Sequence, residues 1–370
     1  MAEKNFGSST KVVIKYIPIE QGKKVLILNP LEISWVFALA KKYPNSEFIV
    51  YQSDLGIFNS FCKYFRESLD VQKRISLITD SELDDYKIPD NMVDIVIYQP
   101  EKFSALSLIK LRLLMSKLVL KQSGKLFLIS HMRTGATRHI QILDELFETN
   151  AKIIGKGGGG YRVIETININ THVHTDISVR NKINFQIIGL NLCMDTEDGL
   201  FSKDDLDIGT RILLENVDLS QYERMLDLGC GWGAIGIVAA LANPKGYVVL
   251  IDINTRATTV AFDNIKQLRI QDRSKIISTD DITNIDGNFD LILSNPPFHA
   301  NQVILKSLFG VSFQKLITNG LLYVVVEQTY VLKFQKILKQ IFGNVTVHFE
   351  DKNNHFTILV SIKLSNKIIR

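Results

Sequence analysis

A proline-containing turn in the second half of the chain has residue types that could do chemistry. It comprises Asn295, Pro296, Pro297 and Phe298 and follows an apolar run at 290–294. An aromatic amine or amide nitrogen is a poor nucleophile, so an enzyme must hold both of its hydrogens on acceptors and aim the lone pair. The Asn295 side-chain oxygen and the Pro296 carbonyl can supply these acceptors. We predict that all four residues are catalytic, with Phe298 stacking on the target ring.

A glycine-rich turn precedes this motif in the chain. Its residues are Asp227, Gly229, Gly231, Gly233 and Gly236, placed between an apolar strand and a helical segment. Glycines let the backbone approach a ligand and leave helix N–H groups free to bind it. Asp252 ends the next strand about 20 residues on, where an acid binds ribose hydroxyls. A nucleotide-like ligand is predicted, but this fingerprint alone does not separate a dehydrogenase from a methyltransferase.

Two features distinguish these ligand classes. Nicotinamide sites normally have an apolar residue at the position of Asp227, whereas an acid there suits the ammonium group of a methionine moiety. Asn295 and its turn also follow the fourth strand, at the carboxyl edge where open α/β sheets bind ligands. We therefore predict S-adenosylmethionine as cofactor. The predicted binding residues are Asp227, Gly229, Gly231, Gly233, Asp252, Asn295 and either Asp280 or Asp281, of which Asp280 is our choice although spacing does not decide it.

The elements that position these residues occur twice. The run 24–30 resembles 224–230, 94–100 resembles 290–296, and 124–129 resembles 320–325. Apolar strands alternating with helical segments are typical of a mostly parallel sheet covered on both faces. We predict two tandem Rossmann-like α/β domains, at 1–175 and 176–370, with the seam in the polar stretch 170–182. The glycine run 157–160 is interpreted as a turn.

The first copy lacks the predicted cofactor residues. Asp227, Gly229, Gly231, Asp252 and Pro297 correspond to Ile27, Asn29, Leu31, Gln52 and Glu101. A domain with this fold but without the site is a brace or a binding surface. A basic loop after the run 124–130 contains Arg133 and Arg138, which we predict to contact RNA phosphates.

Composition excludes several classes of protein. The chain of 370 residues is 46% hydrophobic and 22% charged, which excludes a disordered chain. Its longest apolar runs are too short to cross a bilayer, and its start has no apolar signal core. We expect an uncleaved cytoplasmic protein. The three cysteines have no metal-binding spacing, and no metal is expected.

The second half resembles class I S-adenosylmethionine-dependent methyltransferases, and among them the ribosomal RNA small subunit methyltransferase C family. The resembling segments are 199–202, 206–209, 226–231, Asp252 and 294–299. Trp232 departs from the family pattern, because small residues are common at this position. The resemblance implies methyl transfer to the exocyclic N2 of a guanine in ribosomal RNA, with 16S favoured over 23S. It also implies a degenerate first domain that helps to hold RNA.

Other functions remain open at this stage. One alternative is methylation of another exocyclic or amide nitrogen, such as adenine N6 in RNA or glutamine N5 in a protein. Another is a catalytically idle RNA-binding assembly factor. The expected partner is ribosomal RNA or a ribosomal subunit, with no membrane association. The sequence does not give the oligomeric state, and a monomer is favoured.

Overall fold

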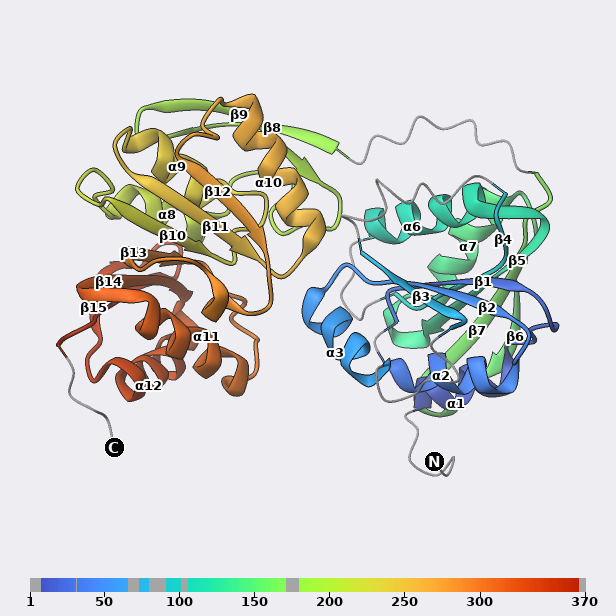
Figure 1. Ribbon diagram of the computed structural model, residues 1–370. Helices are drawn as coiled ribbons and strands as arrows, with labels where there is room; N and C mark the ends of the chain where they lie inside the picture. Colours follow the sequence, from blue (N-terminus) through green and yellow to red (C-terminus); the bar gives the residue numbers. More distant parts are fainter. Residues whose placement is uncertain are drawn as a thin grey trace. The chain divides into compact units, whose positions relative to one another are not determined.

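The computed structural model describes residues 8–30, 32–65, 73–79, 91–100, 106–170 and 180–365. They form two compact units, Met1–Val179 and Arg180–Arg370 (Figure 1). The predicted boundary at 175/176 falls within 171–179, outside the described residues. In the part of the chain that is described, no helix has both the length and the apolar character needed to span a membrane.

Unit 1 alternates strands and helices after an initial helix. Its elements are α1 (Ser8–Tyr16), β1 (Lys24–Leu28), α2 (Ile33–Lys42), β2 (Glu47–Tyr51), α3 (Leu55–Phe65), β3 (Ile75–Ile78), β4 (Val93–Tyr98), α6 (Leu106–Val119), β5 (Leu120–His131), η2 (Met132–Thr134), α7 (Ala136–Phe147), β6 (Lys152–Lys156), η3 (Gly158–Gly160) and β7 (Tyr161–Ile167).

Unit 2 begins with a hairpin and then follows the same succession. Its elements are β8 (Arg180–Ile187), β9 (Leu190–Glu197), α8 (Ile208–Asn216), β10 (Arg224–Leu228), α9 (Ala234–Ala242), β11 (Tyr247–Asp252), α10 (Thr255–Gln267), β12 (Ser274–Ser278), η4 (Ile282–Asn284), β13 (Phe289–Ser294), α11 (Gln302–Lys315), β14 (Leu316–Glu327), η5 (Gln328–Tyr330), α12 (Val331–Phe342), β15 (Thr346–Asp351) and β16 (Phe356–Ile362).

Each unit has one seven-stranded sheet with the same strand order. The orders are β3-β2-β1-β4-β5-β7-β6 and β12-β11-β10-β13-β14-β16-β15, and β8 and β9 form a separate two-stranded sheet. The first five strands of each order pair in parallel, whereas the last two pair antiparallel. The predicted α/β class with mostly parallel sheets is confirmed. The carboxyl ends of β10, β11 and β13 meet at one edge of the second sheet.

Helices cover both faces of each sheet (Figure 1). In unit 1, apolar side chains of α1, α2 and α3 form a core with one face, and those of α6 and α7 form a second core with the other. In unit 2, α8, α9 and α10 pack on one face together with the β8–β9 hairpin, and α11 and α12 pack on the opposite face. The central strands are therefore buried on both sides, which explains their continuous apolar sequences.

Small structural details repeat between the units as well. The Asp94 carboxylate accepts the backbone N–H of Lys24 at 2.9 Å, and the Asp290 carboxylate accepts that of Arg224 at 3.1 Å. In both units a carboxylate on the fourth strand thus fixes the start of the first strand.

Gly155 of β6 and the glycine run 157–160 of unit 1 allow close packing. A side chain at Gly155 or Gly157 would collide with Tyr16 or Val12 of α1, and one at Gly160 would lie 2.9 Å from His131. These glycines therefore let α1 and the β5–α7 connection approach the β6–β7 hairpin.

Candidate active site

The glycine-rich turn between β10 and α9 divides its glycines between two tasks. Gly229 and Gly231 have φ of 78° and 55°, and a Cβ on either would meet nothing within 4 Å. A Cβ on Gly233 would lie 2.8 Å from Ile237, and one on Gly236 would lie 2.5 Å from Leu250. The first two glycines therefore leave open space for a ligand. Gly233 allows close packing against Ile237 and against Ala261 of α10, and Gly236 allows α9 to pack closely on the sheet.

Asp227 lies at the buried end of this turn. It is 1% exposed, and its Oδ2 accepts the backbone N–H of Gly236 at 2.8 Å. Its Oδ1 is buried and has no hydrogen-bond partner among the described residues. Burial raises the pKa of the Asp227 carboxyl to about 7, and the nearby Asp252 charge adds to this rise while the Gly236 N–H opposes it. A cationic ligand group would stabilise the ionised carboxylate.

Asp252, at the end of β11, holds the turn in place. Its Oδ2 accepts the Gly231 N–H at 2.8 Å, and its Oδ1 accepts the Asn254 N–H at 2.8 Å. The sequence predicted a ribose-binding acid at this position, and the geometry adds a structural role in shaping the glycine turn. Of the predicted pair Asp280 and Asp281, Asp281 caps η4, because its side chain accepts the Thr283 N–H at 2.9 Å.

Asn295 lies beside the end of β10. The preceding Ser294 hydroxyl donates to the carbonyl of Leu228 at 2.8 Å, joining β13 to β10 where the glycine turn begins. The Asn295 Nδ2 donates to Asp207 Oδ2 at 2.7 Å and to Thr210 Oγ1 at 3.0 Å. Within the part of the chain that the structure describes, no donor bonds its Oδ1. The side-chain oxygen therefore stays available as an acceptor, as the proposed chemistry requires.

Asp207 and Thr210 are functional candidates that our chemical reasoning missed. The run 206–209 supported the family resemblance, but nothing in the sequence connects it with Asn295, 88 residues away. The sequence feature that could have identified them is the start of a helix. Asp207 is the N-cap of α8 and accepts the Thr210 N–H at 2.8 Å.

The proline turn is braced by the beginning of α12. The Lys333 Nζ donates to the carbonyls of Phe298 and Ala300 at 3.0 Å and 2.9 Å. Tyr330 bonds the His299 Nδ1 at 2.7 Å, and its ring stacks on Phe298 with centroids 5.9 Å apart. Phe298 also contacts Phe356. The predicted stacking of Phe298 on a target base therefore has to use the part of the ring that these neighbours leave accessible.

Trp232 points into the protein core from the glycine turn. It is 4% exposed, and its Nε1 donates to the Phe201 carbonyl at 3.1 Å. The Asn264 Nδ2 donates to the Trp232 carbonyl at 3.0 Å. A bulky residue is therefore accommodated without distorting the turn, because its indole packs under the segment between β9 and α8.

Comparisons with known proteins are consistent with this geometry. Residues 191–360 match the family model described as the methyltransferase small domain. The uncharacterized protein YbxB of Bacillus subtilis is 31% identical over 147 residues, which make up 39% of this chain and 73% of that protein. The chain belongs to the methyltransferase small domain family. Its second unit is called the methyltransferase unit below.

Curated relatives include proteins named as methyltransferases of small-subunit and of large-subunit ribosomal RNA. The ribosomal RNA small subunit methyltransferase C of Pseudoalteromonas translucida is 35% identical over 167 residues, 44% of this chain and 47% of the relative. The ribosomal RNA large subunit methyltransferase G of Psychromonas ingrahamii is 30% identical over 190 residues, 49% of each chain. The chain thus matches about half the length of these relatives. The expected resemblance to the ribosomal RNA small subunit methyltransferase C family is confirmed.

A solved structure shares the fold beyond the methyltransferase unit. The T. thermophilus 16S rRNA N2 methyltransferase RsmC, in complex with AdoMet and guanosine, superposes with a TM-score of 0.79. The match covers 96% of this chain and 91% of that one at 17% sequence identity. At this identity the comparison shows a common fold, which includes both units.

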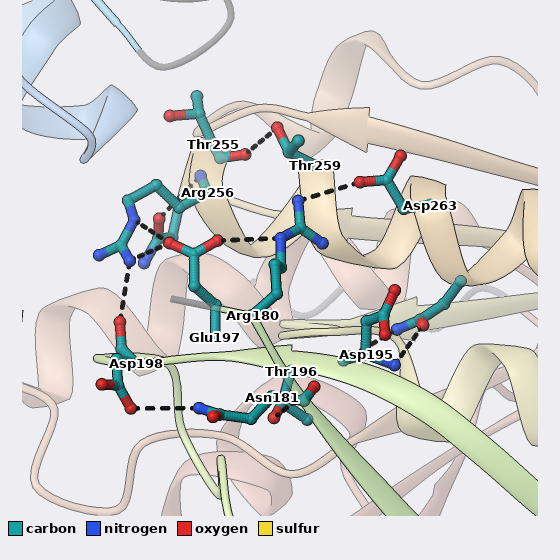
Figure 2. Close-up of polar contacts among 12 residues, drawn as sticks. Arg180, Asn181, Asp195, Thr196, Glu197, Asp198, Thr255, Arg256, Thr259 and Asp263 are labelled. Carbon is teal, nitrogen blue, oxygen red and sulfur yellow. Dashed lines mark hydrogen bonds and ion pairs between the residues drawn. The ribbon is translucent and has the colours of Figure 1, made fainter. Parts of the chain in front are cut away.

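A charged network anchors the β8–β9 hairpin of the methyltransferase unit to α10 (Figure 2). Arg256 is 7% exposed and donates to the Glu197 carboxylate through two nitrogens and to the Asp198 carbonyl at 2.8 Å. Arg180 lies 3.4 Å from Glu197 and 2.9 Å from Asp263. Because Glu197 and Asp198 lie at the end of β9, the network ties the beginning of the segment that leads from β9 to Asp207 to the start of α10.

The corresponding edge of unit 1 is occupied by its own side chains. Gln52 is fully buried, its Nε2 donates to the Pro30 carbonyl at 3.2 Å, and its Oε1 accepts the Asp54 N–H at 3.0 Å. Ile27 is buried in the core, and Asn29 accepts the Ser53 N–H at 3.2 Å. Leu31 and Glu101 lie outside the described residues.

The predicted RNA-binding residues of unit 1 are exposed. Arg133 lies in η2 and Arg138 in α7. His131 supports this connection, because its Nδ1 accepts the Arg133 N–H at 3.1 Å and its Nε2 bonds the Gly159 carbonyl at 2.5 Å. The basic loop is thereby joined to the glycine run, with both arginine side chains at the surface.

Proposed function

We propose that the chain transfers a methyl group from S-adenosylmethionine to the exocyclic N2 of a guanine in ribosomal RNA, with 16S RNA favoured over 23S RNA. The carrying observation is the orientation of Asn295, whose Nδ2 is engaged by Asp207 and Thr210 while its Oδ1 remains an available acceptor next to the cofactor turn. The curated relatives of both ribosomal subunits support RNA as substrate.

The residues at the carboxyl edge fit this cofactor. The orphaned Oδ1 of Asp227 is a partner for an ammonium group, and the space over Gly229 and Gly231 admits a ligand close to the backbone. Asp252 ends β11, in the position of a ribose-binding acid. We assign Asp280 to the adenine end, because Asp281 is used as the cap of η4. When bound, S-adenosylmethionine supplies an electrophilic methyl group.

The residues of the chain orient the nucleophile, which is the exocyclic amino nitrogen of the substrate. Asn295 Oδ1 and the Pro296 carbonyl accept the two amino hydrogens, which directs the nitrogen lone pair toward the methyl carbon. The carbon–sulfur bond breaks as the carbon–nitrogen bond forms. The methylated nitrogen is then strongly acidic and releases a proton to water, so the chain needs no general base. The aromatic ring of Phe298 limits where the target base can lie.

Unit 1 is proposed to be a degenerate methyltransferase domain that holds RNA. The support is the loss of the acid at Gln52, the burial of that side chain and the exposed arginines at 133 and 138. Ribosomal RNA as substrate would place the enzyme in the cytoplasm.

Nucleoside mass spectrometry of ribosomal RNA tests the proposal. RNA from a strain that lacks the protein should lose one N2-methylguanosine, and the purified chain with S-adenosylmethionine should restore it. A missing N6-methyladenosine or an unmethylated protein glutamine would instead assign another nitrogen. Unchanged RNA and protein methylation together with altered subunit assembly would indicate an idle assembly factor.

A further inference from the structure

The carboxamide of Asn295 has a defined orientation because of the chemistry of its neighbours. An asparagine side chain can present either its oxygen or its NH2 group to a site, and the two orientations have nearly the same shape. Asp207 Oδ2 lies 2.7 Å from Asn295 Nδ2. A carboxylate only accepts hydrogen bonds, so the reverse orientation would place the Asn295 oxygen against a negative charge.

Asp207 is itself held by the start of α8. The same Oδ2 accepts the N–H of Thr210, and the Thr210 hydroxyl provides the second acceptor for Asn295 at 3.0 Å. Thr210 is 6% exposed. Gly209, between them, permits the Phe356 ring to approach, since a Cβ there would lie 2.9 Å from it. The helix start is therefore packed against β16, and its two acceptors have little freedom to move.

We propose that Asp207, assisted by Thr210, is a positioning residue that fixes the Asn295 oxygen toward the nucleophile and raises its acceptor strength. A charged acceptor makes a stronger hydrogen bond than a neutral one, and it polarises the carboxamide so that the oxygen becomes more negative. In the reversed carboxamide the NH2 group would face the amino hydrogens and oppose binding of the substrate nitrogen. This inference rests on the proposed function, in which Asn295 holds those hydrogens.

Asp207→Ser separates the positioning role from the helix cap. Serine caps helices well but is too short to reach Asn295. We expect kcat for methylation of ribosomal RNA to fall about 10- to 100-fold, as for loss of a hydrogen bond to a charged group, with KM and S-adenosylhomocysteine affinity within about twofold of wild type. Thr210→Val should lower kcat less. Asp54→Ser, which changes the side chain that bonds the Ile57 N–H at the start of α3 in unit 1, is the matched control and should leave kcat unchanged.

A charge exchange keeps the proposal testable if Asp207→Ser fails to fold. Asn295→Asp alone places two carboxylates in contact and should nearly abolish transfer. The double variant Asp207→Asn/Asn295→Asp reverses the hydrogen bond and restores one donor between the two positions. We expect its kcat to exceed that of Asn295→Asp at least tenfold, an increase that a purely structural role of Asp207 would not produce.

The outcomes separate the two hypotheses. Suppose that wild type methylates guanine N2, that the charge exchange gives no recovery of kcat, and that Thr210→Val and Asp207→Ser retain the wild-type kcat. The positioning role of Asp207 is then wrong, and the proposed function stands. If wild type methylates no nitrogen, both are overturned. Methylation of a different nitrogen would refute only the guanine assignment, and the same variants would then be measured on that substrate.

Discussion

The two units solve the same folding problem but use the carboxyl edge of the sheet differently. At the end of the second strand, Asp252 accepts an N–H of the glycine turn, whereas Gln52 donates to the Pro30 carbonyl. Both also accept the N–H two residues further on, at Asn254 and Asp54. A carboxamide in place of the carboxylate thus preserves the local turn and links the strand end to its own connection.

The connection after the first strand shows the same contrast. In the methyltransferase unit, α9 begins at a glycine with φ of 95° and has no side-chain cap. In unit 1, the N-cap of α2 is Glu32, which is in extended conformation and likewise makes no side-chain cap. Gly229 and Gly231, which precede the start of α9, leave open space beside the backbone, since a Cβ on either would meet nothing within 4 Å. The comparison teaches that both copies share one topology, while they differ in a few residues at the strand ends.

The largest expected effect concerns Asn295 and its counterpart Gln99, which ends the corresponding strand in unit 1. Asn295→Ala should lower kcat 10²–10³-fold, about 3–4 kcal/mol by analogy with one oxyanion-hole donor, and should change KM much less. Gln99→Ala should leave kcat unchanged. Single-turnover methylation of RNA measures the step. A wild-type transfer rate for Asn295→Ala would make the proline turn a scaffold only.

The cofactor acid gives the next effect. Asp252→Ala should weaken S-adenosylhomocysteine binding by about 1.5–3 kcal/mol, roughly 10- to 100-fold, because ribose hydroxyls and the Gly231 N–H lose an acceptor. Asp252→Asn keeps one acceptor oxygen and should lose less, and Gln52→Ala in unit 1 should lose nothing. Isothermal titration calorimetry tests all three. Unchanged affinity of Asp252→Ala would remove this residue from the site.

The pH dependence of stability distinguishes Asp227 from its apolar counterpart Ile27. The Asp227 pKa is raised to about 7 by burial, while an unfolded aspartate has a value of about 3.9. At a pH between these two pKa values, unfolding therefore releases a proton from Asp227. The contribution of this group to the free energy of unfolding is present below about pH 3.9 and is lost as the pH rises through about 7.

Asp227→Asn should consequently stabilise the cofactor-free protein at pH 8 by about 1–3 kcal/mol and bring little gain at pH 4. It should also weaken S-adenosylhomocysteine binding, because the ammonium group loses its anionic partner. Thermal unfolding at several pH values measures the first effect and calorimetric titration the second. An equal gain at both pH values would contradict the raised pKa.

The smallest effect is expected at the surface of unit 1. Substituting Arg133 and Arg138 together should reduce the salt dependence of RNA binding by a slope of up to about 2, at about 0.9 or less per phosphate contact. Cofactor affinity should not change. Lys336 and Lys339, exposed on α12, are a matched pair in the methyltransferase unit. Equal salt slopes for the arginine variant and wild type would show that this loop faces solvent and does not contact RNA phosphates.

Much of the fold follows from the sequence because it depends on short-range patterns. The runs before Asn29 and Gly229 are the strands β1 and β10, and each is followed by a helix, α2 or α9. β1 and β10 are buried on both faces, and such strands have continuous apolar sequences that can be recognised in a single sequence. The catalytic and cofactor residues were likewise chosen at strand ends, and their roles stay predictions.

The side-chain partners of the site could not be predicted, because they connect distant parts of the chain. Asp207 resembles an ordinary N-cap until the fold brings it to Asn295. Trp232 departs from the family pattern in a glycine turn, yet the core beneath Phe201 accepts its indole. Even Gly157, expected to serve a turn, is explained by the Val12 side chain that packs against it. Such pairings depend on tertiary proximity, for which local sequence gives no signal.

The chain contains two tryptophans, one in each unit. Trp35 is fully buried in α2, and Trp232 lies in the glycine turn with its indole on the Phe201 carbonyl. Replacing either one with phenylalanine leaves a single tryptophan, whose emission can be excited selectively over that of the tyrosines. Emission from Trp232 would then follow occupation of the turn by the cofactor, and emission from Trp35 would follow unfolding of unit 1, so that the two halves can be observed separately without an attached dye.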